Sequence, residues 1–200
     1  YADRIYQINL AIAGIAIGTV LLPKLSEYVE KKNFSKINYI QDKSLELSLF
    51  LSLPAMLALL VAPKEITSSL FGYGSFDVKS VENSSKALFY FAFGVPAFAL
   101  IKIFSTFLFA RHNTKVPFYF SIFSVLLNIF ISITFFNKIG FIIIPISTTI
   151  SSWSNVILLF LYLNNKKYFT LNSKTTFSFI KILCSSSISV YLFYLVLTNF

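Results

Sequence analysis

Six long apolar runs divide the chain, and shorter segments rich in lysine separate them. The runs cover residues 5–22, 47–62, 87–110, 116–137, 139–165 and 182–200. Each run approaches or exceeds the roughly 20 residues that a helix needs to cross a bilayer. None shows the ten-residue alternation of a membrane β-barrel strand, so helices are favoured. The pattern therefore predicts an all-α, polytopic transmembrane helix bundle of six spanning helices.

Composition supports the membrane assignment. Of the 200 residues, 56% are hydrophobic and 12% are charged, whereas soluble domains carry about 25% charged residues. The formal net charge of +9 comes from lysines between the apolar runs, so membrane topology explains it better than nucleic-acid binding. A single cysteine excludes an internal disulfide and a cysteine metal cluster.

The loops differ in their content of lysine and arginine. Segments 23–43, 111–115 and 164–174 contain ten such residues, whereas the alternate loops contain four. Positive loops remain in the cytoplasm. We therefore expect these three segments to be cytoplasmic and both Tyr1 and Phe200 to lie outside.

Two further patterns refine this topology. Apolar residues recur near helical spacing over 24–43 among lysines and glutamates, which predicts an amphipathic helix on the cytoplasmic membrane face. Pro54, Pro96 and Pro145 interrupt apolar runs, and a proline inside a helix removes a backbone hydrogen bond. Kinks are expected at these three prolines.

Charged residues in or beside the apolar runs are the candidate functional groups. Asp3 and Arg4 precede the first run, where Arg4 is either a snorkelling anchor or a ligand in a cavity. Adjacent helical residues point about 100° apart, so this pair is expected to serve different partners. Lys102 lies within the third run, about 12 Å from its end at Ala110. Cavity lining and snorkelling are equally consistent with that depth.

Uncharged polar residues share helix faces within the fourth and fifth runs. They are Asn128, Ser132, Thr148, Ser151 and Asn155. One interpretation is hydrogen bonding between two helices, and the other is an oxygen cage for a hard cation. No carboxylate lies in either run, which weighs against a cation. No metalloprotease, hydrolase or nucleotide-binding motif occurs either, so a transporter or a membrane scaffold is favoured over an enzyme.

Several sequence blocks resemble the MurJ/MviN lipid II flippases of the MOP exporter superfamily. The blocks are YADRIYQ, GTVLLPKLS, SLPAMLALL, LFGYGSF, ARHNTKVP and STTISSWSN, in the family's order. The resemblance implies a fourteen-helix transporter, of which this chain is an internal piece. Residues 1–165 would be the carboxyl-terminal lobe, with family helices 8 to 12, and residues 166–200 a linker and the beginning of helix 13.

The resemblance also implies a function and a substrate. Such proteins move lipid II, the undecaprenyl-diphosphate-linked peptidoglycan precursor, from the inner to the outer leaflet of the bacterial cytoplasmic membrane. The family's Asp-Arg pair matches Asp3 and Arg4, whose guanidinium would contact the diphosphate, and Lys102 matches a family lysine. The alternatives are another exporter of the superfamily, for a polyprenyl-linked oligosaccharide or a small cation, and a scaffold without transport.

Some members of the family carry a sodium site on helices seven, eleven and twelve. Asn128 and Thr148 match two of its side-chain ligands, and Ile144 would supply a backbone carbonyl. Ser132 stands where those members have Asp, and the helix-seven ligand is not in this chain. Apart from sodium at these four residues, no cofactor is expected.

Overall fold

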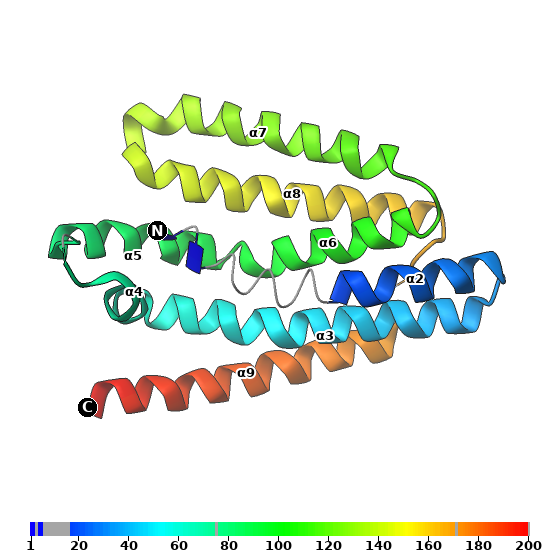
Figure 1. Cartoon of the computed structure of the whole chain (residues 1–200), viewed down its shortest axis with the longest axis horizontal. Helices are drawn as coiled ribbons and strands as arrows, with labels where there is room; N and C mark the ends of the chain where they lie inside the picture. The colour runs from blue at the N-terminus through cyan, green and yellow to red at the C-terminus, as the bar shows by residue number, and fades with distance from the viewer. Residues whose placement is uncertain (3, 6–16, 75, 171, 200) are drawn as a thin grey trace.

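The protein is a bundle of long helices (Figure 1). The computed structural model describes residues 1–2, 4–5, 17–74, 76–170 and 172–199, and no strand occurs among them. The helices are α2 (Ile17–Glu30), α3 (Phe34–Val61), α4 (Pro63–Phe71), α5 (Val78–Ala92), α6 (Val95–Phe109), α7 (Lys115–Ile139), the 3₁₀ turn η2 (Gly140–Ile142), α8 (Ile143–Asn165) and α9 (Ser173–Asn199). The predicted all-α fold class is confirmed.

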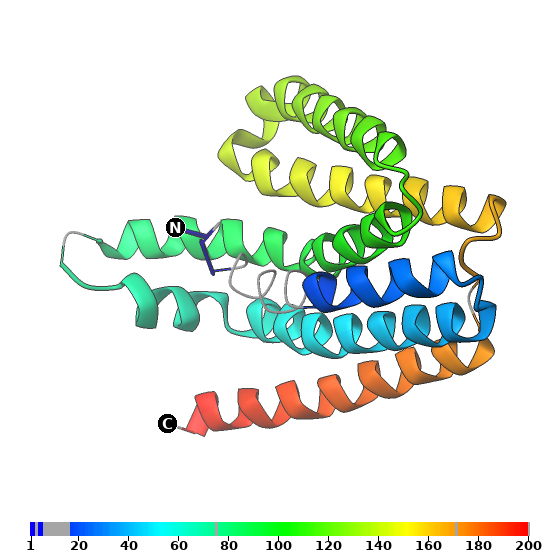
Figure 2. The same cartoon turned by 45° about the vertical axis from the view of Figure 1, so that its right-hand side comes forward.

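The helices pack mainly against a few spatial neighbours. The hairpin of α7 and α8 lies on one side of α6, and α9 lies on the far side of α3 (Figures 1 and 2). Between them, α2 packs against both α3 and α6. The main hydrophobic core joins Leu25 of α2, Phe104 and Phe107 of α6, Leu159 of α8 and Phe169 of the α8–α9 loop.

Three continuous helical stretches within the described ranges are long and apolar enough to cross a membrane. They are Phe34–Val61, Lys115–Asn165 and Thr175–Leu197, and the bent pair Val78–Ala92 and Val95–Phe109 makes a fourth when taken as one span. The 51-residue stretch Lys115–Asn165 folds back at the turn between α7 and α8, which lie side by side (Figure 1). These helices match the second to sixth predicted runs, while most of the first run lies outside the described residues.

The segment 24–43, expected as one amphipathic helix, is helical but divided. Helix α2 continues to Glu30, and α3 begins at Phe34 after a tight turn. The side chain of Asn33 caps α3 by accepting a hydrogen bond from the Lys36 amide at 3.2 Å. The Asn33 cap begins a new helix at this point, so the polar residues of 24–43 belong to the end of α2 and the beginning of α3.

Two of the three prolines begin helices instead of kinking them. Pro145 lies in the first turn of α8, where no backbone hydrogen bond is lost, whereas α3 continues as one helix through Pro54, and the kink expected there stays a prediction. The bend comes at Phe93 and Gly94, where α5 and α6 meet at 45°. Pro96 is the second residue of α6, so it favours the new helix instead of kinking an old one.

Three helices end in the same type of cap. Lys32, His112 and Lys167, after α2, α6 and α8, have φ between 51° and 56°. In each case the following amide donates to a carbonyl five residues back, as Asn33 donates to Tyr28 at 3.0 Å. This is the Schellman arrangement, and basic residues suit the negative end of a helix. All three caps lie at the end of the bundle that carries the lysine-rich loops (Figure 1).

Candidate functional site

A polar cluster joins α7 and α8. The Asn128 Nδ2 atom donates to Thr148 Oγ1 at 2.9 Å, and the Ser132 and Ser147 hydroxyls lie 2.7 Å apart. Ser132 is also 3.4 Å from Asn128 Oδ1. The spacing of four residues on each helix places these groups on facing sides, so the structure brings together the predicted residues of both runs.

The predicted backbone ligand also belongs to this cluster. The Ile144 carbonyl accepts hydrogen bonds from Thr148 Oγ1 at 2.8 Å and from Ser147 Oγ at 3.0 Å. Sequence reasoning did not single out Ser124, whose hydroxyl donates to the Ser151 carbonyl at 2.8 Å. Asn155 is buried one turn further along α8, and its Oδ1 atom accepts no hydrogen bond in the described structure.

This cluster fits interhelical hydrogen bonding better than it fits sodium. Its oxygens are of the class that hard cations accept, and they converge from two helices. However, the described cluster contains no carboxylate, and its hydroxyls already donate to Ile144, Thr148 and Asn128. The described cluster thus links the two helices through hydrogen bonds and offers a cation no negative ligand of its own.

Lys102 lies on the open face of α6. Most side chains of this helix are buried, whereas Lys102 and Phe109 are exposed and Phe98, Ile101 and Ser105 are half-buried. These five positions recur at helical spacing, so they form one stripe that the other described helices leave uncovered. A lysine in such a stripe is available to an anionic ligand or to a further part of the protein.

Arg4 lies at the opposite end from the lysine-rich loops. Its side chain is exposed, while Ala2 and Ile5 are buried against Leu88 and Val95. The adjoining Tyr1 ring packs edge-on to Phe71 at 5.0 Å between centroids. Asp3, the other member of the predicted pair, lies outside the described residues.

A half-buried arginine, which sequence reasoning did not weigh, lies at the other end of the bundle. Arg111 donates to the Phe107 carbonyl at 2.7 Å and to the Tyr168 carbonyl at 2.9 Å, and its guanidinium lies over the Tyr168 ring. Gln41 of α3 donates to the same Tyr168 carbonyl at 3.2 Å. Burial lowers the pKa of Arg111, although an arginine remains protonated. The sequence feature that could have identified Arg111 is its position at the end of an apolar run, in the block ARHNTKVP.

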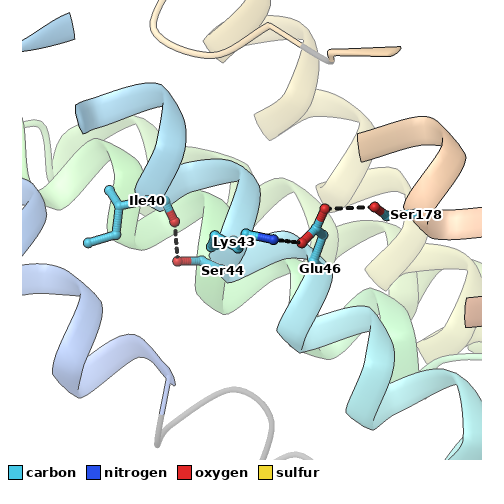
Figure 3. A network of polar contacts seen from close by, with 5 residues as sticks. All are labelled: Ile40, Lys43, Ser44, Glu46 and Ser178. Atoms are coloured by element: carbon cyan, nitrogen blue, oxygen red, sulfur yellow. Dashed lines mark hydrogen bonds and ion pairs between the residues drawn. The ribbon is translucent and has the colours of Figure 1, made fainter. Parts of the chain in front are cut away.

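A polar contact also joins α3 to α9 (Figure 3). One carboxylate oxygen of Glu46 lies 2.6 Å from the Lys43 ammonium, and the other accepts the Ser178 hydroxyl at 2.7 Å. Ser178 is 132 positions away along the chain. One carboxylate thus binds a cation of its own helix and a hydroxyl of the neighbouring helix.

Long apolar helices, lysine-rich loops at one end and polar contacts between helices define a multi-pass membrane protein. The sequence model of the family described as "Lipid II flippase MurJ" matches residues 1–199, and the chain belongs to that family. The resemblance seen in the sequence blocks is thereby confirmed.

Individual relatives agree with this assignment. The chain is 39% identical over 160 residues to the "Probable lipid II flippase MurJ" of Rhizobium meliloti, covering 80% of this chain and 30% of the relative. It is 30% identical over 166 residues to the "Lipid II flippase MurJ" of Burkholderia cenocepacia, covering 83% and 32%. The solved structure "Lipid II flippase MurJ, inward closed conformation" superposes with a TM-score of 0.83 at 30% identity, covering 98% of this chain and 40% of that one. The chain thus spans about a third of the length of its curated relatives.

Proposed function

We propose that this chain is part of a lipid II flippase. The protein would move the undecaprenyl-diphosphate-linked headgroup from the inner to the outer leaflet by alternating access, with no covalent step. The observation that carries the proposal is the family match over residues 1–199. The superposition on a solved flippase over 98% of this chain supports it.

The proposed substrate contacts are Arg4 and Lys102, and Asp3 belongs to the same proposal through the resemblance. A diphosphate carries negative charge along its length, and a guanidinium binds phosphate oxygens through two parallel hydrogen bonds. Both cations are exposed in the described structure. An ammonium on the open stripe of α6 would hold the same anion midway along the bundle.

The proposed cycle uses no cation at the α7–α8 cluster. Asn128, Ser132, Thr148 and the Ile144 carbonyl already bond to one another or to Ser147. We therefore assign this cluster to holding two helices together. Replacing sodium by potassium should leave transport within about twofold, and a larger loss would return these four residues to the role of ion ligands.

The protein would lie in the bacterial cytoplasmic membrane. Its lysine-rich loops 23–43, 111–115 and 164–174 would face the cytoplasm, with Tyr1 outside. In the structure these three loops gather at one end of the bundle, and Tyr1 lies at the other (Figure 1). A headgroup bound near Arg4 would then be close to the outer leaflet, where the substrate is released.

Substitution of the proposed contacts in the full-length protein tests the proposal. Arg4→Ala should abolish growth of a flippase-depleted cell, and Lys102→Met should reduce flipping in proteoliposomes by at least tenfold, because each removes a cation from the anion's path. Lys138→Met, at the exposed end of α7, is the matched control and should retain activity. Membrane insertion is checked for each variant.

Full activity of both variants would show that these cations are not substrate contacts. A wild-type protein that inserts but flips no lipid II in proteoliposomes would favour the scaffold. Flipping of a different polyprenyl-linked oligosaccharide in its place would favour another exporter of the superfamily.

A further inference from the structure

A surface groove of about 500 Å³ lies along the seam between α3 and α9. Lys43 and Glu46 of α3 and Ser178 and Lys181 of α9 form its polar part. This groove is separate from the open stripe of α6 and from Arg4.

The groove lies where both helices change from polar to apolar. Residues 47–62 of α3 and 182–200 at the other side of the seam contain no charged residue, and Lys43 and Lys181 precede these two runs. The border between polar and apolar residues marks the level of the lipid headgroups. The groove therefore has a charged head at the headgroup level and an apolar floor on the hydrocarbon side.

The charge of the groove favours an anion. The Glu46 carboxylate is used by Lys43 and Ser178, yet an ammonium has three donors, so Lys43 retains capacity for another partner. The Lys181 ammonium lies 4.5 Å from the centroid of the Phe177 ring. Among the described residues, no carboxylate lies within ion-pair distance of Lys181. Of the charged residues that line the groove, two are lysines and one is a carboxylate, so the lining is net positive.

The floor suits an acyl chain. Leu47 and Phe50 are 48% and 55% exposed, and Ile182 lines the same groove. A second groove follows on the same seam, lined among others by Leu57 and Val61. From Leu47 to Val61 the helix rises about 21 Å, and one leaflet of hydrocarbon is about 15 Å deep. The apolar surface is thus long enough for one acyl chain.

We propose that the α3–α9 groove binds an anionic phospholipid of the surrounding bilayer. Its phosphate lies between Lys43 and Lys181, and one acyl chain lies over Leu47, Phe50 and Ile182. Basic pockets between membrane helices are known to accept anionic headgroups. The bound lipid would hold α9 against α3, because it contacts both helices at once.

The test compares two short-chain lipids that differ only in headgroup charge. The full-length protein in neutral detergent is titrated with dioctanoyl phosphatidylglycerol or dioctanoyl phosphatidylcholine, and its thermal stability is measured. A lipid that binds only the folded state raises that stability progressively once its concentration exceeds the dissociation constant. We expect phosphatidylglycerol to do so and phosphatidylcholine to have little effect.

Paired variants locate the site. Lys43→Gln with Lys181→Gln should bind phosphatidylglycerol about 30-fold more weakly, which corresponds to about 1 kcal/mol for each lysine. Lys115→Gln with Lys138→Gln, both exposed on α7, removes the same charge elsewhere and should bind normally. Lys181→Gln alone leaves the pair between Lys43 and Glu46 intact and should show an intermediate loss.

A photoreactive phosphatidylglycerol gives a second, independent readout. A diazirine on its acyl chain should label the peptides that contain Leu47 and Phe50, and less strongly in the double variant. Equal stabilisation by both lipids, or unchanged affinity in the double variant, would overturn the proposal. Neither measurement involves lipid II, so a failure here leaves the proposed flippase function standing, and the reverse also holds.

Discussion

At the scale of single residues, polar side chains within this apolar chain stabilise contacts between helices. Helical spacing predicted that Asn128 and Ser132 share one face of their helix, and the structure places that face against Thr148 of the neighbouring helix. It did not predict the Ser147 hydroxyl between them, since spacing gives the face of a helix but not the rotation of its neighbour. Contacts such as that of Glu46 with Ser178 join residues so far apart in the chain that no local pattern contains them.

Arg111 offers a prediction at this scale. Arg111→Met should lower stability by about 3 kcal/mol, because it removes two charge-assisted hydrogen bonds to part-buried carbonyls. Arg111→Lys keeps the charge but cannot reach both carbonyls in the geometry of a guanidinium, so it should lose about half as much. Thermal unfolding in detergent measures both, and equal stability of the three proteins would contradict the structural role of Arg111.

At the scale of elements, the break between α5 and α6 shows where sequence reasoning reached its limit. Pro96 indicated that the helix is interrupted, but the position of the bend depends on α8. Side chains of α8 donate hydrogen bonds to backbone carbonyls at the bend. Thr149 donates to the Tyr90 carbonyl at 2.9 Å, and Trp153 donates to the Phe93 carbonyl at 3.0 Å. A side chain at Gly94 would meet Thr149 Oγ1 at 3.1 Å, so a glycine permits this close approach.

Removing these donors should loosen the bend. Thr149→Val and Trp153→Phe each leave a carbonyl unpaired, and we expect each to cost about 0.6–1.7 kcal/mol, as interhelical hydrogen bonds in membranes do. Amide hydrogen exchange should increase around residues 94–98. Ser154→Ala is the control, because that hydroxyl bonds only within its own helix, to the Ile150 carbonyl. Unchanged exchange in both variants would mean that α6 holds the bend without help from α8.

At the scale of the whole molecule, the hydrophobic pattern predicted most of the architecture. The apolar runs correspond to α3, the α5–α6 pair, α7, α8 and α9, and the loops of high positive charge gather at one end (Figure 1). Long runs predict helices well because the backbone in a bilayer must satisfy its own hydrogen bonds. The packing of α9 on α3 was not predicted, since the apolar surface of a membrane helix fits lipid and protein equally well.

The orientation of the bundle can be tested with single cysteines. On a background without other cysteines, with Cys184→Ser, a membrane-impermeant maleimide should label Tyr73→Cys in intact cells and Ser35→Cys only after permeabilisation. Both positions are exposed and lie at opposite ends of the bundle, Ser35 beside the lysine-rich loops and Tyr73 near Tyr1. The excess of positive charge near Ser35 keeps that end in the cytoplasm. The reverse labelling would place Arg4 at the cytoplasmic face, where a diphosphate contact would act in uptake from the inner leaflet instead of release to the outer one.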